Sequence, residues 1–274
     1  MKTGCAASIP IIPTLPPTAT LTPAPTLPAT NTPIPPTPTV SLEWVQAAPG
    51  IEVRAMMMPL PDSDPAEVIL TRITPALVTI RVEYAPDGPL HVSEWQSTLG
   101  AAVIINGGFF REDHTTAGLL IREGEAHGVS FDQIDAPGYE HGGMFSVTGG
   151  VPSIRLLSAS PYFEGEDIDF ALQGLPILID QGAPVDFHLP ERPARRTAAA
   201  VDASGRLILI TVSAKSVMLI QFRDWLASNP ELALVEVVGL DGGPSTGLAI
   251  RTGAINVMRD SFTPVPSVLA IFTN

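Results

Sequence analysis

Short runs of alternating apolar and polar residues dominate the sequence after position 42. Examples are residues 51–58 (IEVRAMMM), 67–73 (EVILTRI) and 76–84 (ALVTIRVEY), with the turn-rich stretch MPLPDSDP between the first two. A period of two is typical of strands with one buried face, and Pro, Asp and Gly residues favour turns. The pattern predicts a meander of antiparallel strands at the start of the folded region.

A longer pattern occurs twice: a helical segment, an apolar strand, and then a polar residue followed by two glycines. Residues 92–99 (VSEWQSTL) precede the strand AAVIIN, and residues 213–228 (SAKSVMLIQFRDWLAS) precede the strand LALVEVVGL. The turns that follow are Asn106-Gly107-Gly108 and Asp241-Gly242-Gly243. If the two strands are neighbours, Asn106 and Asp241 line one cleft. The alternative is two ordinary glycine turns at strand ends.

The remaining segments join short apolar runs through Gly, Pro or Asp turns. One of them, RTAAAVDASGRLILITVS, is typical of a hairpin, and the C-terminal PSVLAIFT of a closing strand. No fixed-period repeat occurs. We expect an α+β fold: a single strand-rich domain over residues 42–274, with a mixed or antiparallel sheet and two or three helices.

Residues 1–41 differ in composition from the rest. The first forty residues hold 11 of the 29 prolines and 10 threonines, a composition typical of an extended, disordered tether. Cys5, the only cysteine, stands just before the Pro/Thr-rich stretch and resembles the lipidated cysteine of a bacterial lipoprotein, although no apolar signal segment precedes it. We expect an extracytoplasmic protein, secreted or membrane-anchored through lipid on Cys5. The alternative is an unremarkable free cysteine in a disordered tail.

Charge and motif content narrow the functional classes. The net charge of −13 disfavours nucleic acid as a partner, since phosphate backbones are bound by clustered Lys and Arg. The sequence contains neither a phosphate-binding P-loop nor His/Cys pairs at zinc spacing. We therefore expect no cofactor and no dedicated metal site, while a divalent cation stays open.

Residues 243–247 (GPSTG) match the G-x-S-x-G pattern of serine hydrolases, with Ser245 as the nucleophile. That pattern requires a helix directly after the serine. The following TGLAIRTGAINVM favours a strand or hairpin instead, and all five histidines precede Ser245. A serine esterase is therefore the weakest of the functions considered.

Two other places carry candidate chemistry. Adjacent Arg195 and Arg196, next to Thr197 at the start of a strand, could clamp a phosphate or carboxylate, or could be a surface pair in an acidic chain. His141 lies beside glycines in EHGGMF and could approach a ligand. The alternative is an exposed histidine in a turn with no role in binding.

The ordered set NGGFF (106–110), QGLPILIDQG (173–182), RRTA (195–198) and GLDGGPS (239–245) resembles the phosphodiester glycosidase family. The resemblance spans about residues 43–274 and implies an α+β fold that hydrolyses a sugar–phosphate linkage. The residues it indicates are Asn106, Gly107, Gly108, Arg196, Thr197, Asp241, Gly242, Gly243 and Ser245. Pro244 departs from the family pattern, in which a glycine or another small residue is common.

The expected mechanism follows from the charge that develops during glycoside cleavage. A carboxylate beside the anomeric carbon stabilises an oxocarbenium-like transition state, and Asp241 is the first candidate. Arg196 would neutralise the phosphate, while Asn106 and Ser245 would orient oxygens of the ligand. Glu140, Asp180 and His141 are reserve candidates for a second acid or base. The competing function is a non-catalytic module that binds cell-envelope polysaccharide.

Overall fold

The computed structural model describes residues 42–61, 63–134, 138–187 and 192–274. The expectations for residues 1–41, including lipid on Cys5, fall outside these ranges. No helix within the described ranges is long and apolar enough to cross a membrane.

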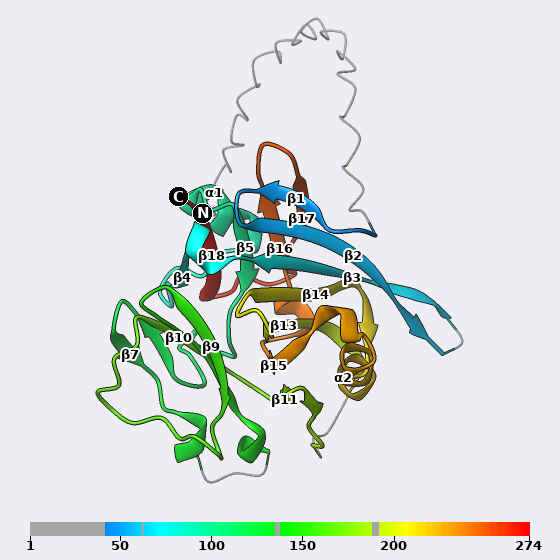
Figure 1. Ribbon diagram of the computed structural model, residues 1–274. Helices are drawn as coiled ribbons and strands as arrows, with labels where there is room; N and C mark the ends of the chain where they lie inside the picture. The colour runs from blue at the N-terminus through cyan, green and yellow to red at the C-terminus, as the bar shows by residue number, and fades with distance from the viewer. Residues whose placement is uncertain (1–41, 62, 135–137, 188–191) are drawn as a thin grey trace, which may run out of the picture. The chain divides into compact units, whose positions relative to one another are not determined.

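An eight-stranded sheet forms the largest element of the fold (Figure 1). Its strands, in spatial order, are β1 (Val45–Ala48), β2 (Ile51–Leu60), β3 (Ser63–Ile73), β14 (Leu207–Val217), β13 (Ala194–Asp202), β15 (Leu234–Gly239), β11 (Ile177–Asp180) and β12 (Ala183–Pro184). β2 and β3 form the long hairpin that the alternating pattern predicts, and β13 and β14 form the hairpin predicted around Asp202–Gly205.

Two five-stranded sheets accompany it. The first is β7 (Glu125–His127), β6 (Leu120–Arg122), β10 (Phe170–Gly174), β8 (Gly143–Thr148) and β9 (Val151–Leu156). The second is β17 (Asn256–Arg259), β16 (Leu248–Arg251), β5 (Val103–Asn106), β18 (Ser267–Thr273) and β4 (Val78–Tyr84). Strand pairs within the described sheets are antiparallel throughout, for example β5 with β16 and with β18.

Two α-helices, α1 (Val92–Leu99) and α2 (Leu219–Ala227), complete the α+β fold that the sequence predicts. The described ranges also contain five single turns of 3-10 helix: η1 (Pro75–Leu77), η2 (Phe131–Gln133), η3 (Tyr139–His141), η4 (Pro230–Leu232) and η5 (Gly243–Ser245). The helix predicted at 92–99 is confirmed. The one predicted at 213–228 begins only at Leu219, because β14 continues to Val217, which pairs with Ala194. Sheet pairing overrides local helix propensity there.

Alternating residues in each strand serve different cores, as the period of two requires. Val103 and Ile105 of β5 join the central core with Leu209 and Ala199 of the eight-stranded sheet. Ile104, on the other face of β5, packs with Trp95 of α1. On the far side of the eight-stranded sheet, α2 packs against β13 and β15 (Figure 1). The sheets therefore meet face to face, and each helix covers an outer face.

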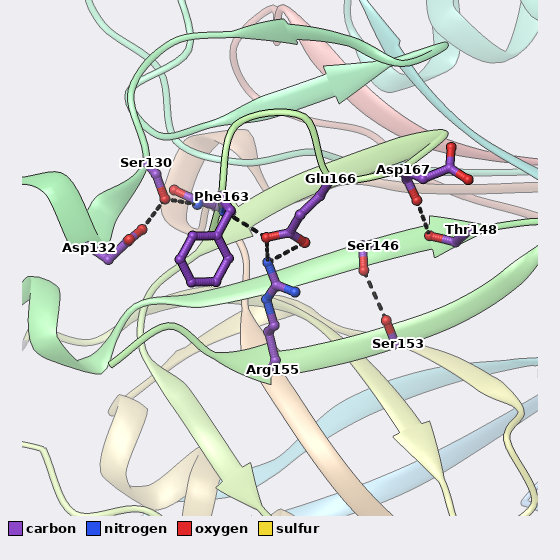
Figure 2. Close-up of polar contacts among 10 residues, drawn as sticks. Ser130, Asp132, Ser146, Thr148, Ser153, Arg155, Phe163, Glu166 and Asp167 are labelled. Atoms are coloured by element: carbon purple, nitrogen blue, oxygen red, sulfur yellow. Dashed lines mark hydrogen bonds and ion pairs between the residues drawn. The ribbon is translucent and has the colours of Figure 1, made fainter. Parts of the chain in front are cut away.

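Polar contacts also fix the segment that connects two strands of the β6–β10 sheet (Figure 2). Arg155 Nη2 of β9 lies 2.8 Å from both carboxylate oxygens of Glu166, and the N–H of Phe163 donates to Glu166 Oε1 at 2.7 Å. These bonds hold the segment between β9 and β10 over a small core that includes Met144 and Leu157.

The sheets connect closely at Gly174, the last residue of β10. The N–H of Leu175 donates to the carbonyl oxygen of Gly239 at 2.8 Å, which joins β10 to the end of β15. A Cβ atom on Gly174 would stand 2.2 Å from that carbonyl oxygen. Only glycine fits at this junction, so the position of the residues after Gly239 depends on it.

We predict that Gly174→Ala lowers the free energy of unfolding by about 1–3 kcal/mol or more, because the added methyl group pushes two sheets apart. Urea unfolding measures the change. Gly88→Ala is the matched control, since a Cβ there has nothing within 4 Å. Equal unfolding midpoints for the two variants would contradict the conclusion that only glycine fits at position 174.

Candidate active site

The side chain of Asn106, at the end of β5, connects three separate parts of the chain. Its Nδ2 donates to the carbonyl oxygen of Asp241 at 2.8 Å. Its Oδ1 accepts a bond from Thr197 Oγ1 at 2.8 Å and another from the N–H of Gly247 at 3.1 Å. Asn106 is fully buried, and both ends of its amide are used within the protein. This arrangement fixes the Asp241 loop relative to β5 and β13.

The predicted convergence of Asn106 and Asp241 occurs, but by a different route. β5 and β15 belong to different sheets and are not neighbours. Their ends meet instead, where the N–H of Asp241 approaches the carbonyl oxygen of Gly107 at 3.3 Å in addition to the Asn106 bond. A strand-order argument based on adjacent strands is therefore wrong, although the two loops do come together.

Thr197 lies in β13 beneath this junction. Its Oγ1 is 3.2 Å from Thr246 Oγ1, which can donate to it while Thr197 donates to Asn106. Thr197 and Thr246 are both buried. Sequence reasoning found Thr197 but missed Thr246 and Gly247, because no spacing pattern links them to Asn106.

Asp241 is the acidic side chain at the junction, and it keeps partial exposure to solvent. Burial raises the pKa of Asp241 from 3.8 to about 6, although hydrogen bonds from the Ser245 side chain and the N–H of Gly242 oppose the shift. The Gly242 N–H lies 2.8 Å from Asp241 Oδ1. A carboxylate whose pKa is close to neutral can exist in either protonation state at physiological pH, as acid–base chemistry requires.

The glycines around Asp241 have different environments. A Cβ on Gly107 would lie 2.3 Å from Ser267 Oγ, one on Gly108 would lie 2.8 Å from Gln173 O, and one on Gly242 would lie 2.8 Å from Arg195 O. Packing within the chain thus explains these three glycines. Gly243 has φ +59°, and nothing would lie within 4 Å of its Cβ. Of the four, Gly243 is the one that faces open space.

Ser245 does not occupy a nucleophile elbow. It ends the single turn η5 and is buried, and the chain continues into strand β16 rather than into a helix. The predicted strand or hairpin after Ser245 is confirmed by the pairing of β16 with β17. Ser245 instead acts as a hydrogen-bond partner of Asp241.

The two adjacent arginines have different surroundings. Arg196 donates from Nε to Val217 O at 3.0 Å and from Nη2 to Arg192 O at 2.8 Å. Arg195, which the sequence offered together with Arg196 as a possible anion clamp, is buried and donates from Nη2 to the carbonyl oxygens of Thr246 and Asp260. Arg195 therefore contacts the loop after Asp241 directly.

The reserve candidates contact residues other than Asn106 and Asp241. His141 and Glu140 belong to η3, where the His141 ring lies edge-on to Phe187 at 6.5 Å and the Glu140 carboxylate accepts the N–H of Gly138. Asp180 ends β11 near Glu236. Glu236 lies within β15 and five residues before Asp241, so Asp180 lies beside that strand and not on the Asp241 loop. The described ranges contain no group of three His, Cys, Asp or Glu residues that could hold a metal ion.

Comparison with known proteins identifies the family. The sequence profile of the phosphodiester glycosidases matches residues 99–272. The structure is similar to the zebrafish N-acetylglucosamine-1-phosphodiester alpha-N-acetylglucosaminidase catalytic domain auto-inhibited by its pro-peptide, with TM-score 0.62, 16% identity, and coverage of 86% of this chain and 87% of the other. A hypothetical protein from Synechocystis gives TM-score 0.59 and 16% identity, with coverage of 87% and 64%.

Among curated protein sequences, none matches the chain. The profile covers more than half of the sequence, so this chain belongs to the phosphodiester glycosidase family. The resemblance seen in the four sequence motifs is confirmed, and the family supports a glycosidase-type function.

We predict that Asp241→Asn stabilises the protein in a pH-dependent way. A folded-state pKa of about 6 means that the folded protein binds more protons than the unfolded chain between about pH 4 and 6. The stability of the wild type therefore falls as the pH rises through that window. Asparagine keeps an acceptor for Gly242 without the charge, so the variant gains about 1–3 kcal/mol at pH 8 and little at pH 4. Urea unfolding of the wild type and the variant at pH 4 and pH 8 measures this gain in stability. An equal gain at both pH values would contradict the raised pKa of Asp241.

Proposed function

We propose that this protein hydrolyses the glycosidic bond to phosphate in a sugar-1-phosphodiester of envelope or extracellular glycans. One observation carries the proposal: in a member of the phosphodiester glycosidase family, the Asp241 carboxylate lies on an anchored loop with its pKa raised to about 6. The composition of residues 1–41 favours an extracytoplasmic location, with lipid on Cys5 as the proposed anchor.

In the proposed reaction, water adds to the anomeric carbon and the bond from that carbon to the phosphate oxygen breaks. The phosphate monoester leaves with the electron pair, one O–H bond of the water breaks, and its proton passes to solvent. Positive charge develops on the sugar ring before water is fully bonded, and ionised Asp241 stabilises it. A phosphate leaving group is already weakly basic, so the protein needs less general-acid assistance than for an alcohol.

The other residues take supporting parts in this proposal. Asn106 and Thr197 position the loop, because their polar groups bond within the protein. Ser245 and the Gly242 N–H stabilise the ionised form of Asp241. Gly243 lets the ligand approach the backbone. Arg196 remains the proposed partner of the phosphate, with a guanidinium oriented by Val217 and Arg192. Gly107, Gly108 and His141 stay candidate contacts.

The test is the release of free sugar from a synthetic glycosyl-1-phosphodiester, followed by NMR. We predict that Asp241→Asn lowers kcat at least about 100-fold, as expected when a charge that stabilises the transition state is removed. Asp180→Asn, which changes a carboxylate at the end of β11 near Glu236, is the matched control and should keep wild-type activity. Full activity in Asp241→Asn would overturn the assignment. Binding of wall polysaccharide without sugar release would favour the non-catalytic module.

A second prediction concerns pH. Because the ionised carboxylate is the active form, kcat/KM should rise with pH through about 6. Ser245→Ala removes a bond that lowers the Asp241 pKa, so the acidic limb should move to higher pH, and Ser245→Thr should restore it. If the acidic limb of Ser245→Ala lies at the same pH as that of the wild type, the prediction is wrong. Loss of all activity in Ser245→Ala, together with labelling of Ser245 by a fluorophosphonate, would favour the serine esterase.

A further inference from the structure

Phe262 is the most exposed large apolar side chain in the described part of the protein, with 75% of its surface accessible. It lies beside the proposed catalytic loop, because its N–H donates to the carbonyl oxygen of Pro244 at 2.7 Å. Pro244 follows Asp241 by three residues, so their Cα atoms are at most about 11 Å apart. The backbone of Phe262 is thus bonded to the same loop that carries Asp241.

One face of the Phe262 ring is held by Arg195. The Arg195 guanidinium stacks on it, with Cζ 4.0 Å from the ring centroid. Arg195 is only 7% exposed, and its Nη2 donates to the carbonyl oxygens of Thr246 and Asp260. One face of the ring thus rests on a buried, anchored cation. An exposed fraction of 75% requires the opposite face to be open to solvent.

The remaining nitrogens of Arg195 strengthen this interpretation. Nε and Nη1 are buried and have no hydrogen-bond partner among the described residues. Burial lowers the pKa of Arg195, while Asp260 opposes that shift. The face of the Phe262 ring is therefore a principal favourable contact of the Arg195 guanidinium. Each of the two side chains restricts the movement of the other. The ring is preorganised, so a ligand that stacks on it loses little entropy in fixing the side chain.

An open, preorganised aromatic face suits a pyranose ring. The C–H bonds on one face of a sugar carry partial positive charge, and the face of an aromatic ring is electron-rich. We propose that Phe262 is a stacking platform for the pyranose ring of the substrate, with Arg195 as its positioning residue. This inference rests on the proposed function, since it places the sugar beside Asp241.

Phe163 supplies a matched control. It is 67% exposed, and its N–H is bonded to Glu166 Oε1 on the segment between β9 and β10 (Figure 2). If any exposed aromatic ring binds the sugar nonspecifically, removal of either ring should weaken binding equally. If Phe262 is the stacking platform, only its removal should weaken binding.

The experiment compares Phe262→Ala, Phe262→Trp and Phe163→Ala in the full chain. With a glycosyl-1-phosphodiester, Phe262→Ala should raise KM about tenfold with little change in kcat. Phe262→Trp should restore KM, and Phe163→Ala should match the wild type. A KM in Phe262→Ala within twofold of the wild type, while hydrolysis proceeds, overturns the platform and leaves the proposed function intact.

Binding without turnover separates the two proposals. Titration of the free sugar, followed by NMR, should show about tenfold weaker binding to Phe262→Ala than to the wild type. If the wild type binds the sugar in this way but releases none from the phosphodiester, the proposed function fails and the platform stands. If Phe262→Ala binds the sugar as well as the wild type does, the platform fails.

A double-mutant cycle tests the part played by Arg195. Arg195→Lys keeps the charge but loses the flat guanidinium, so KM should rise in the wild-type background. In the Phe262→Ala background, the same substitution should cause no further rise, because its effect passes through the ring. Equal increases in both backgrounds would limit Arg195 to a structural role.

Discussion

The buried amide of Asn106 is the interaction on which the candidate site depends. Three segments from two sheets bond to this one side chain: the Asp241 loop, Thr197 of β13 and Gly247 before β16. A buried amide must satisfy its donors and its acceptor, and here each bond joins segments distant in sequence. The loops after β5 and β15 cannot shift independently without leaving one of these groups unpaired. The rigidity of the site thus comes from polar satisfaction as much as from packing.

The anchored junction is also responsible for the raised pKa of Asp241. The backbone of the loop is fixed by Asn106, and the carboxylate is held by Ser245 and Gly242 in a place where burial disfavours its charge. Burial and hydrogen bonding act in opposite directions, and burial is the larger effect, so the pKa rises to about 6. A looser loop would let the carboxylate turn to solvent and return toward its usual pKa of 3.8.

The sequence predicted the fold class and the meeting of Asn106 with Asp241, because strand periodicity and glycine turns are local signals. It did not reveal that β5 and β15 lie in different sheets, since antiparallel pairing across long separations leaves little local trace. Residues 213–217 appeared helical because their propensity favours a helix, whereas pairing with β13 makes them a strand. Thr246 and the buried contacts of Arg195 were missed for a similar reason: their partners are backbone or hydroxyl groups from distant segments.

The residue type at position 241 also bears on function. An asparagine there could accept the Gly242 N–H bond and the Ser245 bond without placing a charge in a partly buried site. On stability alone, an aspartate with a raised pKa is the inferior choice, since its ionisation opposes folding above about pH 6. A polysaccharide-binding module needs hydrogen bonds and ring contacts but gains little from such a charge. A glycosidase needs a carboxylate beside the anomeric carbon, held where water cannot screen it. The destabilising charge of Asp241 therefore favours catalysis over binding alone.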